Sequence, residues 1–276
     1  MQNISLVDET FDLNFTPEYI LSIQVSLDGF SFSILDSIQN KVVYLFHQDT
    51  FTNDPGFQLK KIKSVYQEAD LLELPYKKTN LYYTAPEKTT LVPASLFQPE
   101  EAARLYQFTF NASGGEDILY TKLPQADSIA VFGIHHELHE FLKEKHPGIE
   151  IQNDLLVSLS DLSPGKNILK IRVFRKQLAI WAYDQQMRFY NSFYYEGETD
   201  QLYYILGAVN SMGSEPSTVI LDGMVNKHAE IYHRLRQYFN TVQIAVNNKN
   251  LHYSYLIDRL PDARFANLFN SFSCVS

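Results

Sequence analysis

One histidine cluster has the residue types and spacing of a metal site. The run His135-His136-Glu137-Leu138-His139 places His135 and His139 four residues apart, so both imidazoles would share one face of a helix, as metal ligands do. A metalloprotease helix needs glutamate directly after the first of these histidines, where this sequence has His136. Because no cysteine lies nearby and the spacing supplies no third ligand, we interpret the run as a polar helix start. We expect no bound zinc, with His135 and His139 as the alternative metal ligands.

Two Asp-Gly pairs could also carry chemistry. Asp28-Gly29 lies between two runs of alternating apolar residues, which is typical of a type I′ hairpin turn. The alternative is a carboxylate directed into a cleft, as in nucleases that cluster acids around two metal ions. Asp222-Gly223 ends an apolar run, which predicts a turn from a strand into a helix or, alternatively, a ligand contact at the carboxyl edge of a sheet.

The motifs of common catalytic sites are missing from the sequence. It has no Walker loop, no Gly-x-Gly-x-x-Gly, no Gly-x-Ser-x-Gly and no Cys-x-x-Cys. Glycine, from which phosphate-binding loops are built, accounts for only 11 of 276 residues. The single cysteine, Cys274, cannot form an intrachain disulfide, so we expect a reducing compartment and no function for this thiol.

Composition and charge exclude several classes of partner. The chain has 23 Lys and Arg against 32 Asp and Glu, a formal net charge of −9, which disfavours nucleic acids and anionic bilayers. No apolar run approaches the roughly 18 residues that span a membrane, and the N-terminus lacks a leader pattern, so we expect a cytoplasmic protein. Hydrophobic residues make up 45% of the chain and aromatic residues 14%, which predicts a folded protein rich in strands.

Two segments predict the same arrangement of strands. Residues 21–46 read as a three-stranded antiparallel meander, and residues 169–194 repeat the pattern. The two align without a gap, so that Ile23 matches Ile171 and Asp36 matches Asp184. Each meander is followed by helical periodicity and further strands, which predicts a duplicated βββαβαβ unit.

The remaining pattern divides the chain into two lobes. Helices are predicted over residues 57–72, 135–145, 199–212 and 228–239, and a helix is predicted to begin at Pro99. Further strands are predicted over 81–84, 89–93, 118–122, 128–133, 218–222 and 242–246. Residues 160–167 have turn composition, so we predict a first lobe over 1–163 and a second over 164–276. The second lobe is predicted to end in a helix over 258–272, with one aromatic and aliphatic stripe.

The duplicated unit resembles the actin-like ATPase (ribonuclease-H-like) superfamily. The strand end Tyr190-Asn191-Ser192-Phe193, the helix over 200–206 and the aromatic C-terminal helix are similar to a bacterial family of unknown function with that fold. The resemblance covers the chain from about Leu21 to its end. It implies an α/β protein of two lobes, each opening with a three-stranded antiparallel meander, and it implies no particular activity.

The resemblance also assigns positions to the nucleotide motifs of the superfamily. Its ATPases hold phosphates with a glycine-bearing hairpin after the first strand of each lobe, preceded by an aspartate for Mg²⁺. The aspartate positions fall at Gln24 and near Arg172, and the glycine positions fall at Ser26 and near Phe174. The adenosine motif falls at residues 220–224 and keeps one glycine. The sequence therefore departs from the ATPase pattern at all three places.

We accordingly expect a protein-interaction module rather than an enzyme, with an unidentified protein partner and no cofactor. The alternative is a divergent ATPase or nucleotide switch that binds ATP and Mg²⁺ through Gln24, Ser26, Asp222 and Gly223. The two hypotheses differ in whether the cleft between the lobes is open to a ligand or filled by side chains such as Arg172 and Phe174.

Overall fold

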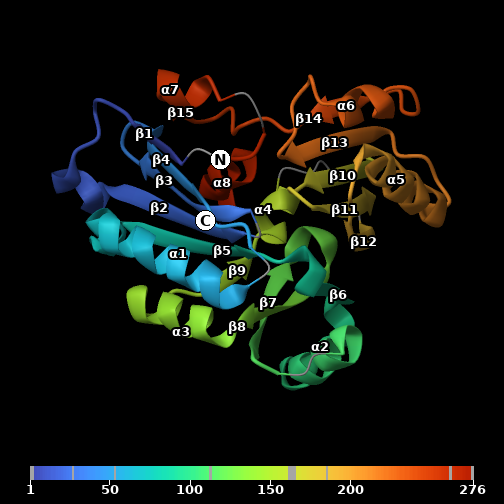
Figure 1. Ribbon diagram of the computed structural model, residues 1–276, viewed down its shortest axis with the longest axis horizontal. Helices are drawn as coiled ribbons and strands as arrows, with labels where there is room; N and C mark the ends of the chain where they lie inside the picture. The colour runs from blue at the N-terminus through green and yellow to red at the C-terminus, as the bar shows by residue number, and fades with distance from the viewer. Residues whose placement is uncertain are drawn as a thin grey trace.

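In the computed structural model the chain forms three β-sheets that are covered by helices (Figure 1). The structure describes residues 3–26, 28–52, 54–111, 114–160, 166–184, 186–260 and 263–274. The predicted boundary between the lobes, at residues 163 and 164, lies outside these ranges. Within the described ranges, none of the helices is long and apolar enough to cross a membrane.

The first sheet has seven strands in the order β1-β4-β3-β2-β5-β9, with β15 also paired to β4. The strands are β1 (Ile4–Val7), β2 (Tyr19–Ser26), β3 (Gly29–Asp36), β4 (Lys41–Asp49), β5 (Lys78–Thr84), β9 (Ile151–Asn153) and β15 (His252–Tyr253). β2, β3 and β4 pair antiparallel, over the residues where alternation predicts it. β5 and β9 then continue the sheet in parallel pairing.

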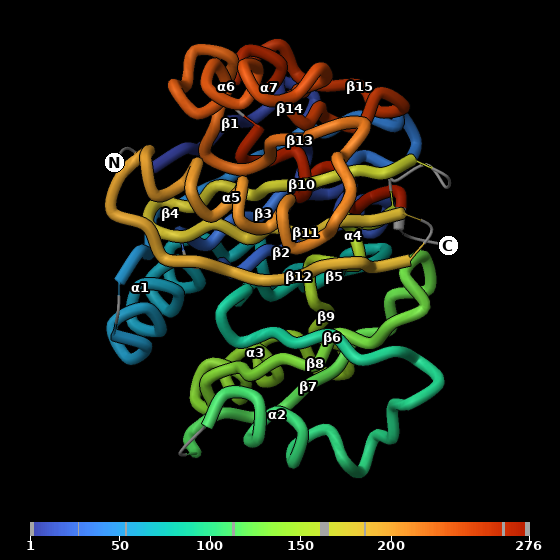
Figure 2. Tube along the Cα trace, turned by 90° about the vertical axis from the view of Figure 1, so that its right-hand side faces the viewer, coloured from blue at the N-terminus to red at the C-terminus, as the bar shows by residue number. Residues whose placement is uncertain are grey.

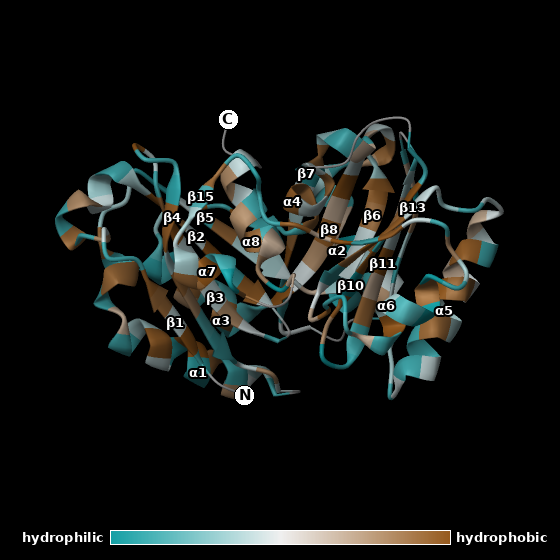
Figure 3. Ribbon diagram, turned by 90° about the horizontal axis from the view of Figure 1, so that it is seen from above, coloured by the Kyte–Doolittle hydropathy of each residue, from teal (hydrophilic) through white to brown (hydrophobic). Residues whose placement is uncertain are grey.

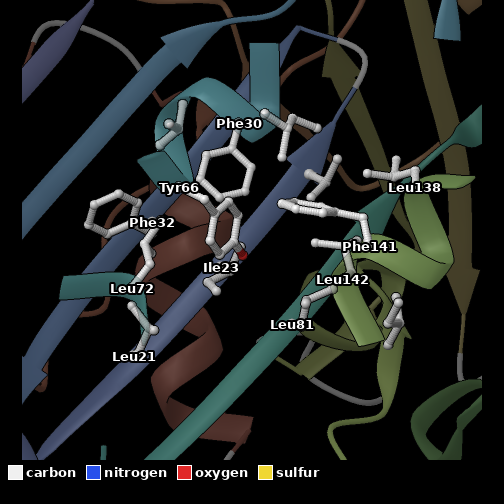
Figure 4. Packing of buried hydrophobic residues seen from close by; sticks show 14 of the residues in the cluster. Leu21, Ile23, Phe30, Phe32, Tyr66, Leu72, Leu81, Leu138, Phe141 and Leu142 are labelled. Atoms are coloured by element: carbon white, nitrogen blue, oxygen red, sulfur yellow. The ribbon is translucent and has the colours of Figure 1, made fainter. Parts of the chain in front are cut away.

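The core of the first lobe lies between this sheet and two helices (Figure 4). α1 (Pro55–Glu68) and α3 (His136–Lys145) cover the sheet face to which the apolar residues of β2 and β3 point. Ile23 packs there with Tyr66 of α1 and Phe141 of α3, whose two rings meet edge to face with centroids 5.2 Å apart. The alternation along β2 and β3 therefore correctly predicts which residues face the core. The apolar stripes of α1 and α3 correctly predict that these helices pack against it.

The C-terminal segment covers the opposite face of the first sheet. It forms α7 (Tyr255–Asp258), α8 (Ala266–Asn270) and the 3₁₀ helix η7 (Ser271–Cys274). The prediction of one helix over 258–272 in the second lobe is wrong, because the segment forms separate short helices that pack against the first sheet. The apolar stripe requires only that these side chains be buried together, which separate short helices achieve as well as one long helix. The predicted stripe is nevertheless buried together: Phe265, Leu268, Phe269 and Phe272.

The second sheet has five strands in the order β12-β11-β10-β13-β14. These are β10 (Ile168–Val173), β11 (Gln177–Asp184), β12 (Gln186–Tyr194), β13 (Thr218–Gly223) and β14 (Val242–Ile244). α5 (Glu198–Met212) and α6 (Glu230–Leu235) cover one face, and α6 is shorter than the predicted helix over 228–239. The other face packs on α4 (Leu155–Ser160) and the third sheet, with Trp181 fully buried between them.

The third sheet consists of β6 (Thr89–Pro93), β8 (Ser128–His135) and β7 (Glu116–Leu123), in that order and antiparallel. α2 (Ala102–Phe110) packs on it. The sequence pattern predicts these strands within the first lobe, and the structure places them in a sheet of their own. Short 3₁₀ helices connect the elements: η1 (Leu13–Glu18), η2 (Asp70–Glu73), η3 (Pro86–Lys88), η4 (Ala94–Leu96), η5 (Pro99–Glu101) and η6 (Pro124–Ala126).

α8 lies between the two larger sheets in both Figure 1 and Figure 3. Its apolar residues pack on the first sheet, and its Asn267 is directed to Asp154 and Ser158 between the lobes. The C-terminal helices are therefore part of the junction between the lobes.

We predict that Phe269→Ala destabilises the protein by about 3 to 5 kcal/mol, because it empties a fully buried aromatic site. Phe108→Ala is the matched control, since the Phe108 side chain is 89% exposed and its loss should change stability by about 0.5 kcal/mol or less. Urea denaturation of both variants measures the difference. Equal stability of the two variants would contradict the burial of the C-terminal segment.

Candidate functional site

The two candidate residues of the first lobe are used inside that lobe. Gln24 lies on β2, and its Nε2 donates to Thr84 Oγ1 of the neighbouring β5 at 3.1 Å. The Oγ of Ser26 donates to the carbonyl of Gly29 at 3.1 Å and accepts from its N–H at 3.2 Å. The Gln24 bond joins β2 to β5, and the two Ser26 bonds join the end of β2 to the start of β3.

Arg172 of the second lobe is the centre of a buried ionic cluster. Its Nε and Nη2 donate to Asp222 Oδ2 at 2.9 and 2.6 Å, its Nη1 pairs with the carboxylate of Asp154, and its Nη2 also donates to Ser158 Oγ at 2.8 Å. Arg172 is 5% exposed, Asp154 4% and Asp222 2%. A guanidinium presents its N–H groups as a rigid fork, which allows one side chain to hold both carboxylates.

The elements of both lobes converge on this cluster. Arg172 on β10 and Asp222 on β13 face each other in the parallel register of the second sheet. Asp154 joins β9 of the first sheet to α4, and its backbone N–H donates to Tyr83 of β5. Asn267 of α8 completes the contacts, since its Nδ2 donates to Asp154 Oδ2 at 3.3 Å. Arg172 thus joins the first sheet to the second through Asp154 and Asp222, and the C-terminal helix joins them by its contact with Asp154.

The charges within the cluster oppose the effect of burial on the pKa of each member. For Asp154, burial raises the pKa overall, although the charge of Arg172 lowers it. Burial alone lowers the pKa of Arg172, but Asp222 and Asp154 raise it overall. Burial raises the pKa of Asp222, and the charges of Arg172 and Lys170 outweigh this and hold it below its ordinary value. Lys170 is also buried, its Nζ donates to the Ser158 carbonyl at 3.1 Å, and it shares the face of Trp181 with Arg172. Two buried basic side chains, Arg172 and Lys170, therefore lie close to two buried acidic ones, Asp154 and Asp222.

Very little space remains beside the cluster. The cavity there has a volume of about 10 Å³. It is lined by residues of both lobes: Thr84, Ala85, Pro86, Thr89, Asn153, Asp154, Leu155, Arg172, Phe174, Ala179, Trp181 and Tyr190. A cavity of that size holds about one water molecule. Arg172 and Phe174, the two residues that replace the aspartate and glycine of the ATPase pattern, both occupy its wall.

The hairpin turns of the two lobes contact each other directly. The carboxylate of Asp28 accepts from the backbone N–H of Arg175 at 3.1 and 3.2 Å, and the Arg175 guanidinium pairs with Asp49. The type I′ turn predicted at Asp28-Gly29 is wrong, because Gly29 has no positive φ and is already the first residue of β3. Gly29 is needed for another reason: a Cβ there would collide with His47 and the Gln48 backbone. Asp28 is directed across the cleft, toward a backbone amide.

Asp222-Gly223 is a turn whose carboxylate already has its partners. Gly223 has φ +84°, and a Cβ there would collide with the carbonyl of Val173. Its N–H donates to Asp222 Oδ1 at 2.7 Å, while Asp222 Oδ2 is held by Arg172. Both oxygens of Asp222 are therefore engaged within the protein.

The histidine cluster is arranged differently from the predicted pair. His135 is the last residue of β8 and precedes α3, so it does not share a helical face with His139. Instead His139 Nδ1 and His136 Nδ1 lie 2.6 and 3.0 Å from Asp117 Oδ2 on β7. Asp117, His139 and Glu140 bring possible ligand atoms within 4.8 Å of one another. The histidine spacing gives no indication of Asp117, because Asp117 lies on β7 and only the pairing of β7 with β8 brings it to α3.

The fold identifies the class of protein. Two mixed sheets with antiparallel β2-β3-β4 and β10-β11-β12 pairings, each continued by parallel strands, form an actin-like ATPase fold. The chain belongs to the family described as protein of unknown function (DUF3822), whose model matches residues 8–242. The resemblance inferred from the sequence is therefore confirmed.

Solved structures show the same fold. A Bacteroides thetaiotaomicron protein with an actin-like ATPase fold and unknown function matches with a TM-score of 0.74 and 23% identity, over 87% of this chain and 96% of that one. A chain of the PilM–PilN type IV pilus biogenesis complex matches with a TM-score of 0.54 and 12% identity, over 93% of this chain and 98% of that one. Among curated protein sequences, none matches this chain.

We predict that Arg172→Met costs about 3 to 5 kcal/mol of stability, because it leaves Asp154 and Asp222 buried without the guanidinium that pairs with both. Arg188→Met is the matched control. Arg188 is solvent-exposed and lies 3.9 Å from Asp184, so its loss should cost less than about 1 kcal/mol. Chemical denaturation at neutral pH compares them, and a small loss for Arg172→Met would show that the cluster does not hold the lobes together.

We further predict that Asp28 makes stability pH-dependent. Burial raises the pKa of Asp28 to about 6 from 3.8, although Arg175 and Arg264 oppose the rise. A carboxyl whose folded pKa is raised contributes stability below its unfolded pKa and loses it as the pH rises through the folded value. Asp28→Asn keeps an acceptor for the Arg175 N–H but has no charge to bury. Between pH 4 and pH 8 its free energy of unfolding should therefore rise by about 2 to 3 kcal/mol relative to that of the wild type.

Asp8→Asn is the control with the opposite sign. Burial raises the pKa of Asp8, but hydrogen bonds from Lys41 and Thr10 lower it overall to about 2. The stability from Asp8 is present above about pH 4 and declines as the pH falls toward 2. Denaturation midpoints across this range measure both variants, and a pH-independent difference between Asp28→Asn and wild type would contradict the assignment.

Proposed function

We propose that this chain is a non-catalytic protein-interaction module built on an actin-like ATPase fold. The observation that carries the proposal is the buried cluster of Arg172 with Asp154 and Asp222 at the position that the superfamily pattern gives to a phosphate-binding motif. The chain's own charged groups occupy this position, and the hairpin turns that would flank a phosphate contact each other through Asp28 and Arg175.

The energetics of the cluster oppose nucleotide binding. A polyphosphate could enter only if Arg172 released its carboxylates, since the adjoining cavity has about 10 Å³. Breaking a buried ion pair costs about 3 to 5 kcal/mol. That cost lowers the affinity of an entering ligand by roughly two to four powers of ten. The site is therefore better suited to hold the lobes in one arrangement than to bind and release a ligand.

The surface supports an interaction role. Leu96 and Phe108 are 72% and 89% exposed, and they line an apolar groove of about 360 Å³ on the third sheet and α2. Exposed aromatic and aliphatic side chains around a groove are typical of protein-binding surfaces. The similar chain of the PilM–PilN complex also occurs in an assembly of two proteins, which supports the same class of function.

A nucleotide switch is the second candidate, and one cavity favours it. A volume of about 610 Å³ begins at Asn226, just after the glycine that remains of the adenosine motif, and Lys227 and Lys249 line it. Such a cavity could hold a nucleoside with its phosphates outside the filled cleft. The two candidates make opposite predictions for Mg-ATP.

We predict that millimolar Mg-ATP does not stabilise the protein. A ligand at 100 times its Kd stabilises the folded state by about 2.7 kcal/mol, which raises the Tm of a chain of this size by roughly 5 to 10 °C. We expect no rise beyond that given by Mg-free ATP or pyrophosphate in thermal unfolding. A magnesium-dependent rise in that range, lost in Lys227→Ala, would favour the nucleotide switch.

A further inference from the structure

The outer edge of the first sheet is covered by the chain itself. β4 is the third strand of the β2-β3-β4 set, and its free side pairs with β1, from Ile4 opposite His47 to Val7 opposite Tyr44. β15 pairs with the beginning of the same strand, with His252 opposite Lys41. Covering an edge strand satisfies backbone groups that would otherwise be open to another chain.

The equivalent edge of the second sheet is not covered in this way. β12 is the third strand of the β10-β11-β12 set and ends the sheet. In the ranges that the structure describes, β11 is the sole strand paired with β12. The position that β1 takes in the first lobe therefore has no counterpart among the described residues in the second.

A groove runs along this open edge. It has a volume of about 590 Å³, and one wall is β12 itself, with residues 187–192 and Tyr194. The facing wall consists of residues 89–91 of β6, the 3₁₀ helix η3 and the end of α2. Figure 2 shows β12 and β6 on facing sides of this region, each at the edge of its own sheet. The groove is thus bordered by two strand edges.

The backbone of β12 is oriented for pairing into the groove. The N–H of Tyr195 donates to the Lys176 carbonyl at 3.1 Å, so this residue points its backbone groups toward β11. In an antiparallel pair, alternate residues point their N–H and C=O outward, which assigns Ser192 and Tyr194 to the open side. The N–H of Ser192 donates instead to the side chain of Asn191, at 2.8 Å from Oδ1. A local side chain thus occupies the place of a partner strand's carbonyl.

We propose that an extended segment of a partner protein adds as a strand along the outer edge of β12. Main-chain hydrogen bonds to Ser192 and Tyr194 would supply affinity, as in other cases of strand addition. The inference rests on the proposed function and adds the edge of β12 as a binding surface beside the groove at Leu96 and Phe108.

The recessed position of the edge favours a slender segment over a second copy of this chain. β6 and α2 face β12 across the groove. A second copy that paired through its own β12 would also carry its own β6 and α2 beside that strand, and these would hinder the approach. An extended peptide has the width of one strand, about 4.8 Å from its neighbour, and needs no such clearance.

A display library of random linear peptides, selected on the full chain, provides the probe. A peptide from the selection should protect the amides of Ser192 and Tyr194 from hydrogen exchange. Ser192→Pro removes the outward N–H without touching the pairing to β11, and should weaken binding about fivefold or more. Ser192→Ala is the matched control, because it loses the same hydroxyl and keeps the N–H, so its affinity should equal that of wild type. Asn191→Ala frees the Ser192 N–H and should tighten binding.

Several results would overturn the inference. These are a selection that yields no binding peptide, peptides that bind wild type and Ser192→Pro equally, or protection confined to other strands. A wild-type dimer in light scattering that Ser192→Pro converts to monomer would assign the edge to a second copy instead. If Ser192→Pro does not fold, hydrogen exchange of the wild type with its peptide decides alone. Failure of these tests with no Mg-ATP stabilisation rejects the inference only, whereas magnesium-dependent stabilisation rejects the proposed function.

Discussion

The guanidinium of Arg172 is the contact on which the arrangement of the lobes depends. It binds Asp154, which follows the last strand of the first sheet, and Asp222, which ends a central strand of the second. Both carboxylates are buried, so separation of the lobes at this point would leave charges without partners in an apolar interior. The C-terminal helix adds Asn267 to the same cluster and fills the space between the sheets.

Under the proposed function, parts of the chain take the place that a nucleotide has in the superfamily pattern. Arg172 and Phe174 occupy the second-lobe positions that the superfamily pattern gives to aspartate and glycine, and they line the small cavity that remains. Asp28 and Arg175 join the two hairpins. A cleft that opens and closes around a nucleotide needs its charged groups exposed in the open state, whereas here they are paired within the protein. The surface of the module is then the part that remains available for binding.

The sequence predicts the strands well and the long-range contacts poorly. Alternation over β2, β3, β10 and β11 is a local signal, and the fold class followed from its repetition. The partners Asp154 and Asp117 carry no local signal, because each meets its cation or imidazole only through strand pairing or lobe packing. The return of α8 to the first sheet was missed for the same reason, since its apolar stripe shows that the helix is buried but not against which sheet.

Crystal structures of the protein grown with and without Mg²⁺ and a non-hydrolysable ATP analogue test the central claim most directly. The claim is that the interlobe position is filled by the chain itself. We expect the same structure in both crystals, with Arg172 bound to Asp154 and Asp222 and the Asp28 carboxylate on the Arg175 amide. A triphosphate between the two hairpins, with Arg172 turned away from its carboxylates, would contradict it.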